Sequence, residues 1–277
     1  MSSLLSARYR TAFVTGASAG LGLAFTEMLL AAGVEVWGTA REAARLKTVH
    51  AKFHPVALEL GDGPAAVRTF LDADQAAGGF DIVINNAGFG AFGAFAATEF
   101  AVWEEQLSVM LVNTARLSQA ALRGMLARKR GALVNISSIA GEFGMPYQAI
   151  YNTTKAGLSA LNASLMYEVK DTGVIVIDFR PGDFRTDFEG SVRRPAQTGA
   201  DARQTGRMAR VWDNFTAMMQ SGPAPAEAAA DLQAALLRGR SGTVRTGRFF
   251  QAVLGPFLAR FGPLGLQRKI QEKYFGL

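Results

Sequence analysis

The chain has 277 residues, 49% of them hydrophobic, and a formal net charge of +6. This length suits one large α/β domain with a full core, and no uninterrupted apolar run is long enough to cross a bilayer. The chain contains no cysteine, which excludes disulfides, thiolate metal sites and cysteine nucleophiles.

The charged residues and the two histidines point to no further partner. Basic residues recur among alanines in residues 185–210 and 238–260, which is typical of a solvated face rather than a nucleic-acid-binding track. His54 precedes Pro55, which disfavours a helix that would bring His50 and His54 together on a metal ion. We therefore expect no nucleic acid and no metal. Residues 1–10 lack the apolar core of a secretory signal, so a cytoplasmic location is expected.

Short apolar strands alternate with helical segments from Thr11 onward. The expected strands are Thr11 to Thr15, Val34 to Thr39, Pro55 to Leu60, Asp81 to Asn85, Ala132 to Ser137 and Val174 to Phe179. The expected helices are Leu21 to Ala32, a weak one after Arg41, one after Pro64, Glu99 to Arg128, and Tyr151 to Asp171. This alternation predicts a Rossmann-type, doubly wound parallel sheet with helices on both faces, in a single domain spanning residues 1–277.

The pattern weakens after Pro181, beyond the expected cofactor-binding and catalytic core of residues 1–186. Residues 187–222 have no clean period and are expected to form a substrate lid. A helix from Pro225 to Leu237 and an edge strand from Thr243 to Phe250 are expected next. The extension 249–277 is interrupted by Gly-Pro pairs, so we expect it to pack on the domain or a neighbouring subunit rather than lie on a membrane.

A glycine-rich turn lies between the first strand and the first helix, from Thr15 to Gly22. At this position the pyrophosphate of a dinucleotide can meet unpaired backbone N–H groups. Gly16 permits the tight turn, Gly20 lets the backbone approach the phosphates, and Gly22 lets the helix pack closely on the sheet, while Ser18 adds a hydroxyl donor. The turn therefore predicts a dinucleotide site.

The tip of the second strand indicates which dinucleotide is bound. It reads Gly-Thr-Ala-Arg and ends at Arg41, without the carboxylate that would accept hydrogen bonds from ribose hydroxyls. A guanidinium at this place attracts a 2′-phosphate, so NADP is favoured over NAD. Glu59 and Asp62 flank the end of the third strand, where either carboxylate could accept from the adenine amino group or remain a solvated loop acid.

Further motifs follow the glycine turn in a recognisable order. They are Asn85-Asn86-Ala87-Gly88, Asn135-Ile136-Ser137-Ser138, Tyr151 with Lys155 four positions later, and Pro181-Gly182. With the glycine turn and Asn113, they resemble the classical short-chain dehydrogenase/reductase family, over residues 11–186. The resemblance implies a nicotinamide-dependent oxidoreductase. It also implies homodimers or homotetramers, with helices 99–128 and 151–171 packed against their copies.

The Tyr151–Lys155 pair has the spacing of one helical turn, so both side chains share a face. A free phenol has a pKa near 10, and a neighbouring ammonium favours the phenolate form. We therefore expect Tyr151 to act as the general acid and base while a hydride moves between the nicotinamide and the substrate carbon.

The family resemblance assigns the remaining roles. Lys155 also holds the nicotinamide ribose, Ser138 orients the substrate oxygen, and Asn113 anchors a proton relay through a helix distortion and a water. Thr186 matches a threonine that holds the nicotinamide carboxamide, whereas Asp183 and Arg185 receive no role. The expected cofactor-binding residues are Gly16, Ser18, Gly20, Leu21, Gly22, Arg41, Glu59, Leu60, Asn85, Asn86, Ala87, Gly88, Tyr151, Lys155, Pro181, Gly182 and Thr186.

The substrate is expected to be hydrophobic or aromatic. Ligands in such sheets lie outside the carboxyl ends of the strands, so residues 88–95, residues 142–148 and the lid should border the nicotinamide. These segments supply mainly apolar side chains: Phe89, Phe92, Phe143, Met145, Tyr147 and Phe188. A sugar would require more amide and carboxylate groups.

Two other function classes share parts of this pattern. A non-catalytic NADP-binding sensor or scaffold could retain the fold, although the complete set Ser138, Tyr151 and Lys155 argues against it. A sugar-nucleotide epimerase or dehydratase uses the same Tyr/Lys pair, but such enzymes are usually longer and have a larger substrate region. The oxidoreductase remains the favoured interpretation.

Overall fold

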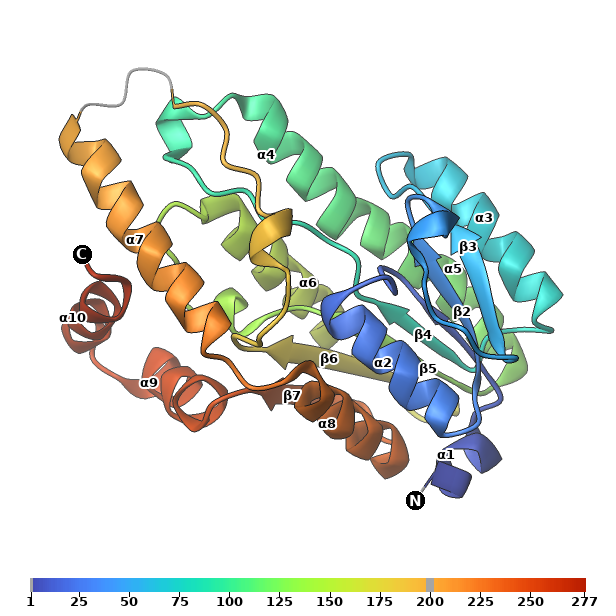
Figure 1. Ribbon diagram of the computed structural model, residues 1–277. Coiled ribbons are helices and arrows are strands. Elements are labelled where there is room, and N and C mark those ends of the chain that lie inside the picture. The colour runs from blue at the N-terminus through green and yellow to red at the C-terminus, as the bar shows by residue number, and fades with distance from the viewer. Residues whose placement is uncertain (1, 198–201) are drawn as a thin grey trace.

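The computed structural model describes residues 2–197 and 202–277, and within them the chain forms one seven-stranded parallel sheet (Figure 1). The strand order is β3-β2-β1-β4-β5-β6-β7. The strands are β1 (Thr11–Val14), β2 (Glu35–Ala40), β3 (Phe53–Ala57), β4 (Ile82–Asn85), β5 (Gly131–Ile136), β6 (Val174–Pro181) and β7 (Gly242–Thr246). This confirms the predicted doubly wound sheet in a single domain. The order reverses between β1 and β4, which opens a crevice at their carboxyl ends.

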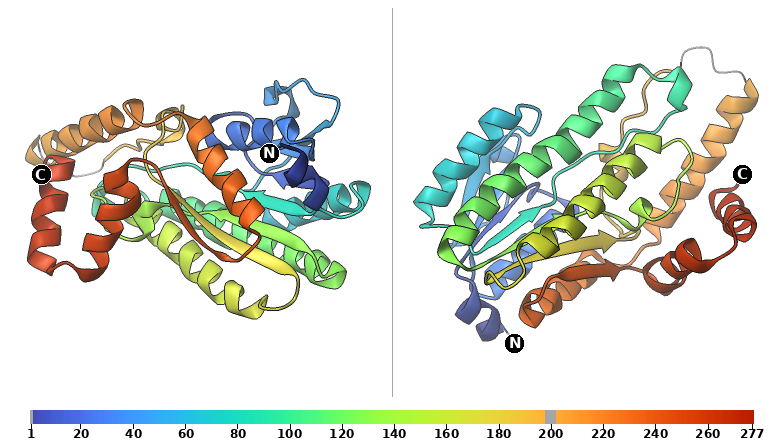
Figure 2. Two further views of the ribbon diagram at one scale, coloured as in Figure 1. Left: turned by 90° about the horizontal axis from the view of Figure 1, so that it is seen from below. Right: turned by 180° about the vertical axis from the view of Figure 1, so that it is seen from behind.

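Helices cover both faces of the sheet (Figure 2). The helices of the core are α1 (Ser2–Arg8), α2 (Gly20–Ala31), α3 (Gly63–Ala76), α4 (Phe100–Leu107), α5 (Asn113–Arg128), α6 (Ala149–Glu168) and α8 (Pro225–Arg238). One face packs against α1, α2 and α8, and the other against α3, α5 and α6.

Successive side chains of a strand point to opposite faces of the sheet, so each strand contributes to both cores. In β1, Ala12 and Val14 face the α2 and α8 side, whereas Phe13 faces the opposite core. Phe13 lies beside Val83 in the register of β1 with β4, and its ring meets Phe70 of α3 edge-on at a centroid distance of 5.1 Å. The strands are therefore buried on both faces, as a parallel sheet requires.

The long predicted helix 99–128 is not uniform. It begins as α4, passes through a π-helical turn at Ser108–Val112, and continues as α5 from Asn113. A π-turn inserts an extra residue into the helical ladder and changes the direction of the side chains that follow. The weak helix expected after Arg41 is only a short 3-10 turn, Ala43–Arg45.

The carboxyl-terminal third is more helical than its sequence suggested. The segment expected as an irregular lid contains α7 (Ala202–Gln220), whose buried side chains form a third cluster with Phe92 and Val192. The extension forms α9 (Gly255–Phe261) and α10 (Leu264–Phe275). A π-turn at Phe250–Leu254 runs into α9, so the expected break at Gly255-Pro256 is absent, because proline is tolerated in the first turn of a helix.

The three helices α7, α9 and α10 gather beyond the end of the sheet toward which the strand arrows point (Figure 1). Gln251 and Phe275 are buried, whereas Phe257 and Phe261 are 58% and 67% exposed, so the extension packs on the domain through one side only. Within the described ranges, no helix has both the length and the apolar character needed to cross a membrane.

Candidate active site

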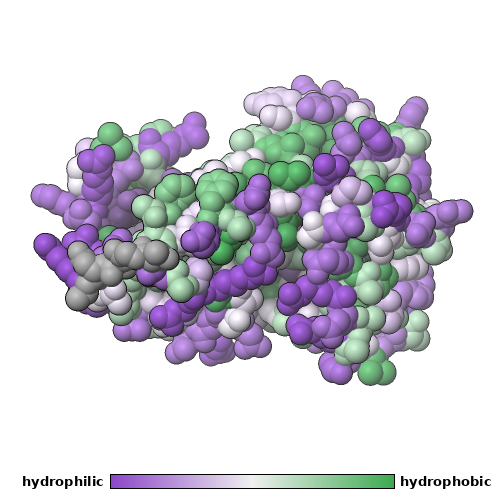
Figure 3. Space-filling view, turned by 90° about the horizontal axis from the view of Figure 1, so that it is seen from above, coloured by the Kyte–Doolittle hydropathy of each residue, from purple (hydrophilic) through white to green (hydrophobic). Residues whose placement is uncertain are grey.

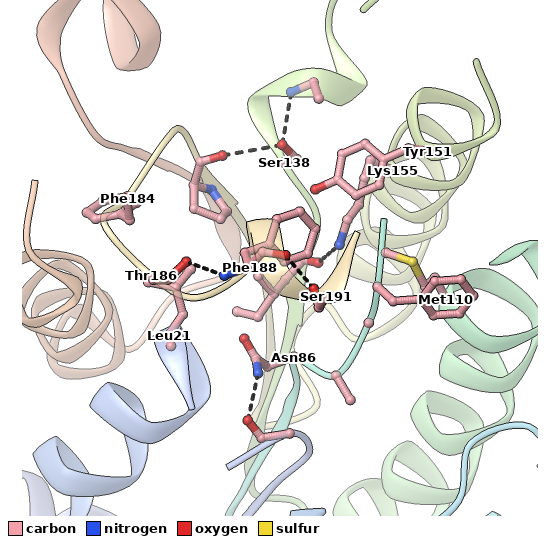
Figure 4. A pocket seen from close by; sticks show the side chains of 18 of the residues that line it. Leu21, Asn86, Met110, Ser138, Tyr151, Lys155, Phe184, Thr186, Phe188 and Ser191 are labelled. Atoms are coloured by element: carbon pink, nitrogen blue, oxygen red, sulfur yellow. Dashed lines mark hydrogen bonds between the residues drawn. The ribbon is translucent and has the colours of Figure 1, made fainter. Parts of the chain in front are cut away.

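A cavity of about 750 Å³ opens at the carboxyl ends of the strands and brings most of the predicted site residues together. Its cofactor-side wall includes Gly16, Ser18, Gly20, Leu21, Arg41, Glu59, Leu60, Asn86, Ala87, Gly88, Pro181, Gly182 and Thr186. Ser138, Tyr151 and Lys155 lie together in its wall, opposite Leu21 and Asn86, with Phe188 and Ser191 between the two groups (Figure 4).

The glycine turn has the backbone geometry that a phosphate site needs. Gly16 and Gly20 have φ values of +69° and +56°, which side-chain-bearing residues rarely adopt. A Cβ on Gly22 would overlap the carbonyl oxygen of Gly16. Helix α2 begins at Gly20, and its N-cap residue Ala19 offers no side-chain cap, so the N–H groups of the first turn are available to an anion.

The loop after β4 is attached to this turn by Thr15, a residue that the sequence analysis did not single out. Its hydroxyl accepts hydrogen bonds from the backbone N–H groups of Asn86 and Ala87, each at 2.9 Å. The Asn86 amide in turn donates to the Thr15 carbonyl at 3.0 Å. A threonine directly after a buried strand and before the glycines was the available signal.

Asn85 is placed differently from expectation. Its side chain is buried and donates to Asn135 at 2.8 Å and to Ser118 at 3.1 Å, and it is not part of the cavity wall. The chain of buried amides continues from Asn135 to Asn162 at 2.6 Å. Asn85 therefore connects strands β4 and β5 to the helices below them, because strand alternation turns its side chain away from the crevice.

The part of the cavity next to β2 and β3 contains side chains of both charges. Arg41 is exposed at the end of β2, and Arg45 of the following 3-10 turn lines the same wall, although the sequence analysis did not assign it. Glu59 and the exposed ion pair Arg193–Glu105 line the cavity as well. Hydrogen bonds from Arg193 are the main cause that lowers the pKa of Glu105. The positive charge of Arg41 makes a smaller contribution in the same direction.

The catalytic candidates come from three elements. Ser138 follows β5, and its hydroxyl accepts from the Ala140 N–H at 3.1 Å and donates to the Pro181 carbonyl at 3.4 Å. Tyr151 and Lys155 lie on α6, with the ammonium nitrogen 5.6 Å from the centre of the phenol ring. The ammonium donates to the carbonyl of Ile136 at 2.8 Å.

The electrostatic balance at this pair differs from the expectation that Lys155 would lower the pKa of Tyr151. Burial raises the pKa of Tyr151 to about 12, and the nearby Ser138 hydroxyl acts in the opposite direction. Burial lowers the pKa of Lys155 to about 8, partly offset by Asp178. The lysine fails to counteract the burial of the phenol because its ammonium is directed at a backbone carbonyl and is itself desolvated.

Asn113 lies outside the cavity wall, but its side chain is hydrogen-bonded to the backbone of a residue in that wall. It is the first residue after the π-turn, and its amide donates to the Leu60 carbonyl at 2.7 Å. The π-turn supplies the helix distortion expected at this position. Leu60 lies in the cavity wall, so Asn113 links the middle of the α4–α5 helix to the loop that follows β3.

The part of the cavity expected to hold the substrate is largely apolar, but two of the aromatic residues expected there do not line it. Phe89, Phe143, Met145 and Phe188 line it, and the Phe188 ring centre is 6.2 Å from that of Tyr151. Phe92 and Tyr147 pack instead into the cluster beneath α7, and Glu142 is occupied by Arg180 and Arg245. Residues of the last third that the sequence analysis missed complete the wall: Phe215, Met218, Met219, Gln251, Tyr274 and Phe275.

In the described part of the chain, no three His, Asp or Glu side chains are grouped so that they could hold a metal ion. His54 pairs with Glu35 at 2.7 Å and stacks on Trp37 with ring centres 4.2 Å apart. This histidine is thus engaged with the outer strands β2 and β3, away from the cavity.

Comparisons with known proteins agree with this geometry. Residues 10–197 match the family model described as short chain dehydrogenase. The chain is 34% identical over 187 residues to the 3-oxoacyl-[acyl-carrier-protein] reductase FabG of Aquifex aeolicus, which covers 65% of this chain and 75% of that relative.

Two solved structures extend the comparison over most of the chain. A short-chain dehydrogenase from Streptomyces avermitilis superposes with a TM-score of 0.81 and 29% identity, covering 95% of this chain and 97% of that one. A metagenomic short-chain oxidoreductase in complex with NADP gives a TM-score of 0.65 and 27% identity, covering 85% and 96%.

Proposed function

Because the chain belongs to the short-chain dehydrogenase family, whose members are oxidoreductases with nicotinamide cofactors, we propose that it is an NADP(H)-dependent enzyme interconverting a ketone or aldehyde with an alcohol. The observation that carries this proposal is the meeting of Ser138, Tyr151 and Lys155 in one cavity with the glycine turn. A sensor or scaffold would not require these three side chains to converge on the same space.

The residues present fit a dinucleotide. The uncapped start of α2 would receive the pyrophosphate, and Thr186 lies directly against Gly20, with its Cβ 3.4 Å from where a Cβ on that glycine would be. A Cβ on Gly88 would come within 2.9 Å of the terminal methyl group of Met110, which lines the same cavity. Arg41 and Arg45 would supply the positive charge for a 2′-phosphate, which favours NADP.

When bound, the nicotinamide would supply or accept the hydride. The chain's own residues manage the substrate oxygen. The Ser138 hydroxyl, held by Ala140 and Pro181, is positioned to hydrogen-bond that oxygen. With a pKa near 12, the Tyr151 hydroxyl is protonated at neutral pH and can donate its proton as negative charge develops on the substrate.

Lys155 acts from behind the phenol. With a pKa of about 8 it is mostly charged at neutral pH, and it would stabilise the phenolate left after proton donation by turning its ammonium from the Ile136 carbonyl toward the phenol oxygen. It is 7% exposed, which excludes most water and strengthens this interaction. Asn113, through Leu60 and the π-turn, would hold the neighbouring helix where a proton relay can reach solvent.

The test of this function is the variant Tyr151→Phe, which removes the hydroxyl and keeps the ring. We expect unchanged NADPH binding, measured by cofactor fluorescence, and a loss of ketone turnover of about 10²-fold or more. The matched control is Tyr167→Phe, because Tyr167 is an exposed phenol on the same helix, 83% accessible. Equal turnover in wild type and Tyr151→Phe would refute the assigned role.

The outer helices carry the features expected of an interface between copies. Phe100, Val112 and Leu126, on α4, the π-turn and α5, are 62%, 47% and 39% exposed. Apolar patches are also visible among hydrophilic side chains on the face seen from above (Figure 3). We propose that α4, α5 and α6 pack against their copies in a homodimer or homotetramer, which light scattering of wild type and Leu126→Glu would test.

A further inference from the structure

Asp183 is a carboxylate in the cavity wall that the proposed proton transfer does not use. It follows Pro181-Gly182 at the end of β6 and is half-buried beside Phe184. Its negative charge is close enough to the phenol to contribute to raising the pKa of Tyr151. The carboxylate therefore lies within electrostatic range of the atom expected to exchange the proton.

The extension orients this carboxylate. The Gln251 amide donates to Oδ2 of Asp183, and the Tyr274 hydroxyl donates to the same oxygen at 3.5 Å. The other end of the Gln251 amide accepts from the Asp183 N–H at 3.1 Å, so one glutamine holds both the backbone and the side chain of Asp183. Gln251 also donates to the Tyr274 hydroxyl at 2.8 Å, which connects the π-turn to α10.

The second oxygen of Asp183 is left for a ligand. Both side-chain hydrogen bonds go to Oδ2, and Oδ1 receives none from residues 2–197 or 202–277. Burial raises the pKa of Asp183, while Gln251, Tyr274 and the charge of Arg248 act in the opposite direction. The Arg248 guanidinium donates to the Ser221 carbonyl, and within the described chain it makes no hydrogen bond to Asp183.

Gln148 is a second polar group of the same cavity without a partner. It precedes Tyr151 by one helical turn, is 2% exposed, and its Oε1 accepts no hydrogen bond within the described chain. A buried carbonyl without a donor costs about 1–3 kcal/mol, so its retention in the wall calls for an explanation. This oxygen is enclosed by protein, so a ligand in the cavity does not reach it, and the polar subsite depends on Asp183.

The rest of this part of the cavity wall is largely apolar. It includes Phe143, Phe184, Phe215, Met219 and Phe275, beside the polar side chains of Asp187, Gln251 and Tyr274. The arginines of the cavity wall lie at its adenosine end, with Glu59 and Glu105. In a largely apolar surrounding, a carboxylate with a free oxygen discriminates strongly between donors, apolar groups and anions.

We propose that Asp183, through its free Oδ1, forms a polar subsite for a hydroxyl or amino group of the substrate. This subsite rests on the proposed function. It limits the substrate to a carbonyl compound, or its alcohol, that has an apolar body and a hydrogen-bond donor near the reacting carbon. An anionic substituent at that place is repelled by the carboxylate.

Three ketones that differ in one substituent test this subsite. Butyrophenone ends in a methyl group, β-hydroxypropiophenone has a hydroxyl there, and β-benzoylpropionate has a carboxylate. In wild type we expect kcat/KM to be about tenfold or more higher for the hydroxyl than for the methyl compound, and lowest for the anion. Asp183→Leu should abolish the hydroxyl preference, and Asp183→Asn should relieve the discrimination against the anion.

The control is Asp213→Asn, which makes the same charge change on the exposed face of α7 and should leave all three ratios unchanged. Ratios that are equal in wild type and both Asp183 variants would overturn the subsite while leaving the proposed oxidoreductase function intact.

If wild type turns over none of the ketones, the proposed function fails for this class. The subsite is then decided by calorimetry with NADP-saturated protein. Binding of the hydroxyl ketone about tenfold tighter than the methyl ketone, lost in Asp183→Leu, supports the subsite, and equal affinities overturn it.

Discussion

Residues 11–186 and residues 187–277 meet at one cavity, but they are held there in different ways. In the first region the wall is built on strand ends, the glycine turn, and loops joined by hydrogen bonds such as those of Thr15. In the second region the wall is made of side chains from α7 and α10, attached through a small apolar cluster and the contacts of Gln251. The first region's wall is thus fixed by backbone hydrogen bonds, and the second region's wall depends on side chains that are far apart along the chain.

The largest contrast between the regions is expected at their glycines. In Gly22→Ala the new Cβ meets the Gly16 carbonyl and Asn86, so we expect a loss of about 3 kcal/mol or more of unfolding free energy, together with weaker NADPH binding. Gly206 of α7 has open space around it, so Gly206→Ala should stabilise by about 0.5–1 kcal/mol. Urea denaturation measures the unfolding free energy of both variants. Losses of equal size would contradict the expected difference between the two regions.

The pH dependence of stability tests the burial of Lys155 in the first region. Its pKa is about 8 when folded and 10.5 ordinarily, so the unfolded chain binds more protons between these values. Stability contributed by this residue must therefore rise as the pH increases from 8 to 10.5. Relative to Lys155→Met, the unfolding free energy of wild type should rise by up to about 3 kcal/mol across this window. A constant difference would show that the ammonium is not desolvated.

Cofactor choice should depend on the adenosine end alone. Removing the Arg41 guanidinium in Arg41→Ala is expected to weaken NADPH binding about tenfold, or about 1.4 kcal/mol, and to leave NADH binding unchanged. Fluorescence titration with both cofactors measures this. An equal effect on the two would refute the phosphate contact.

The smallest effect is expected at the lid of the second region. Arg193 and Glu105 form an ion pair in which each side chain is 45% exposed, so Glu105→Gln should cost less than about 1 kcal/mol of stability, and less at high salt. Urea denaturation at two salt concentrations checks this. A loss as large as that of Gly22→Ala would mean that the lid is held as rigidly as the glycine turn.

The same division explains what the sequence could predict. Gly16, Gly20 and the Tyr151–Lys155 pair were predictable because a tight turn and a helical repeat dictate their placement within a few residues along the chain. Gln251 and Tyr274 were not, because they reach Asp183 across separations of 68 and 91 residues, and no local pattern encodes such contacts. Asn85 was misplaced because its motif does not state which side of the strand each asparagine faces.

The central claim is that this cavity transfers a hydride with Tyr151 supplying the proton. The most direct measurement uses NADPH carrying deuterium at the transferred position, with β-hydroxypropiophenone as acceptor and mass spectrometry of the alcohol. We predict deuterium on the carbinol carbon with wild type, and no labelled alcohol above background with Tyr151→Phe despite unchanged NADPH binding. Alcohol without deuterium, or equal labelled product from the variant, would contradict the account.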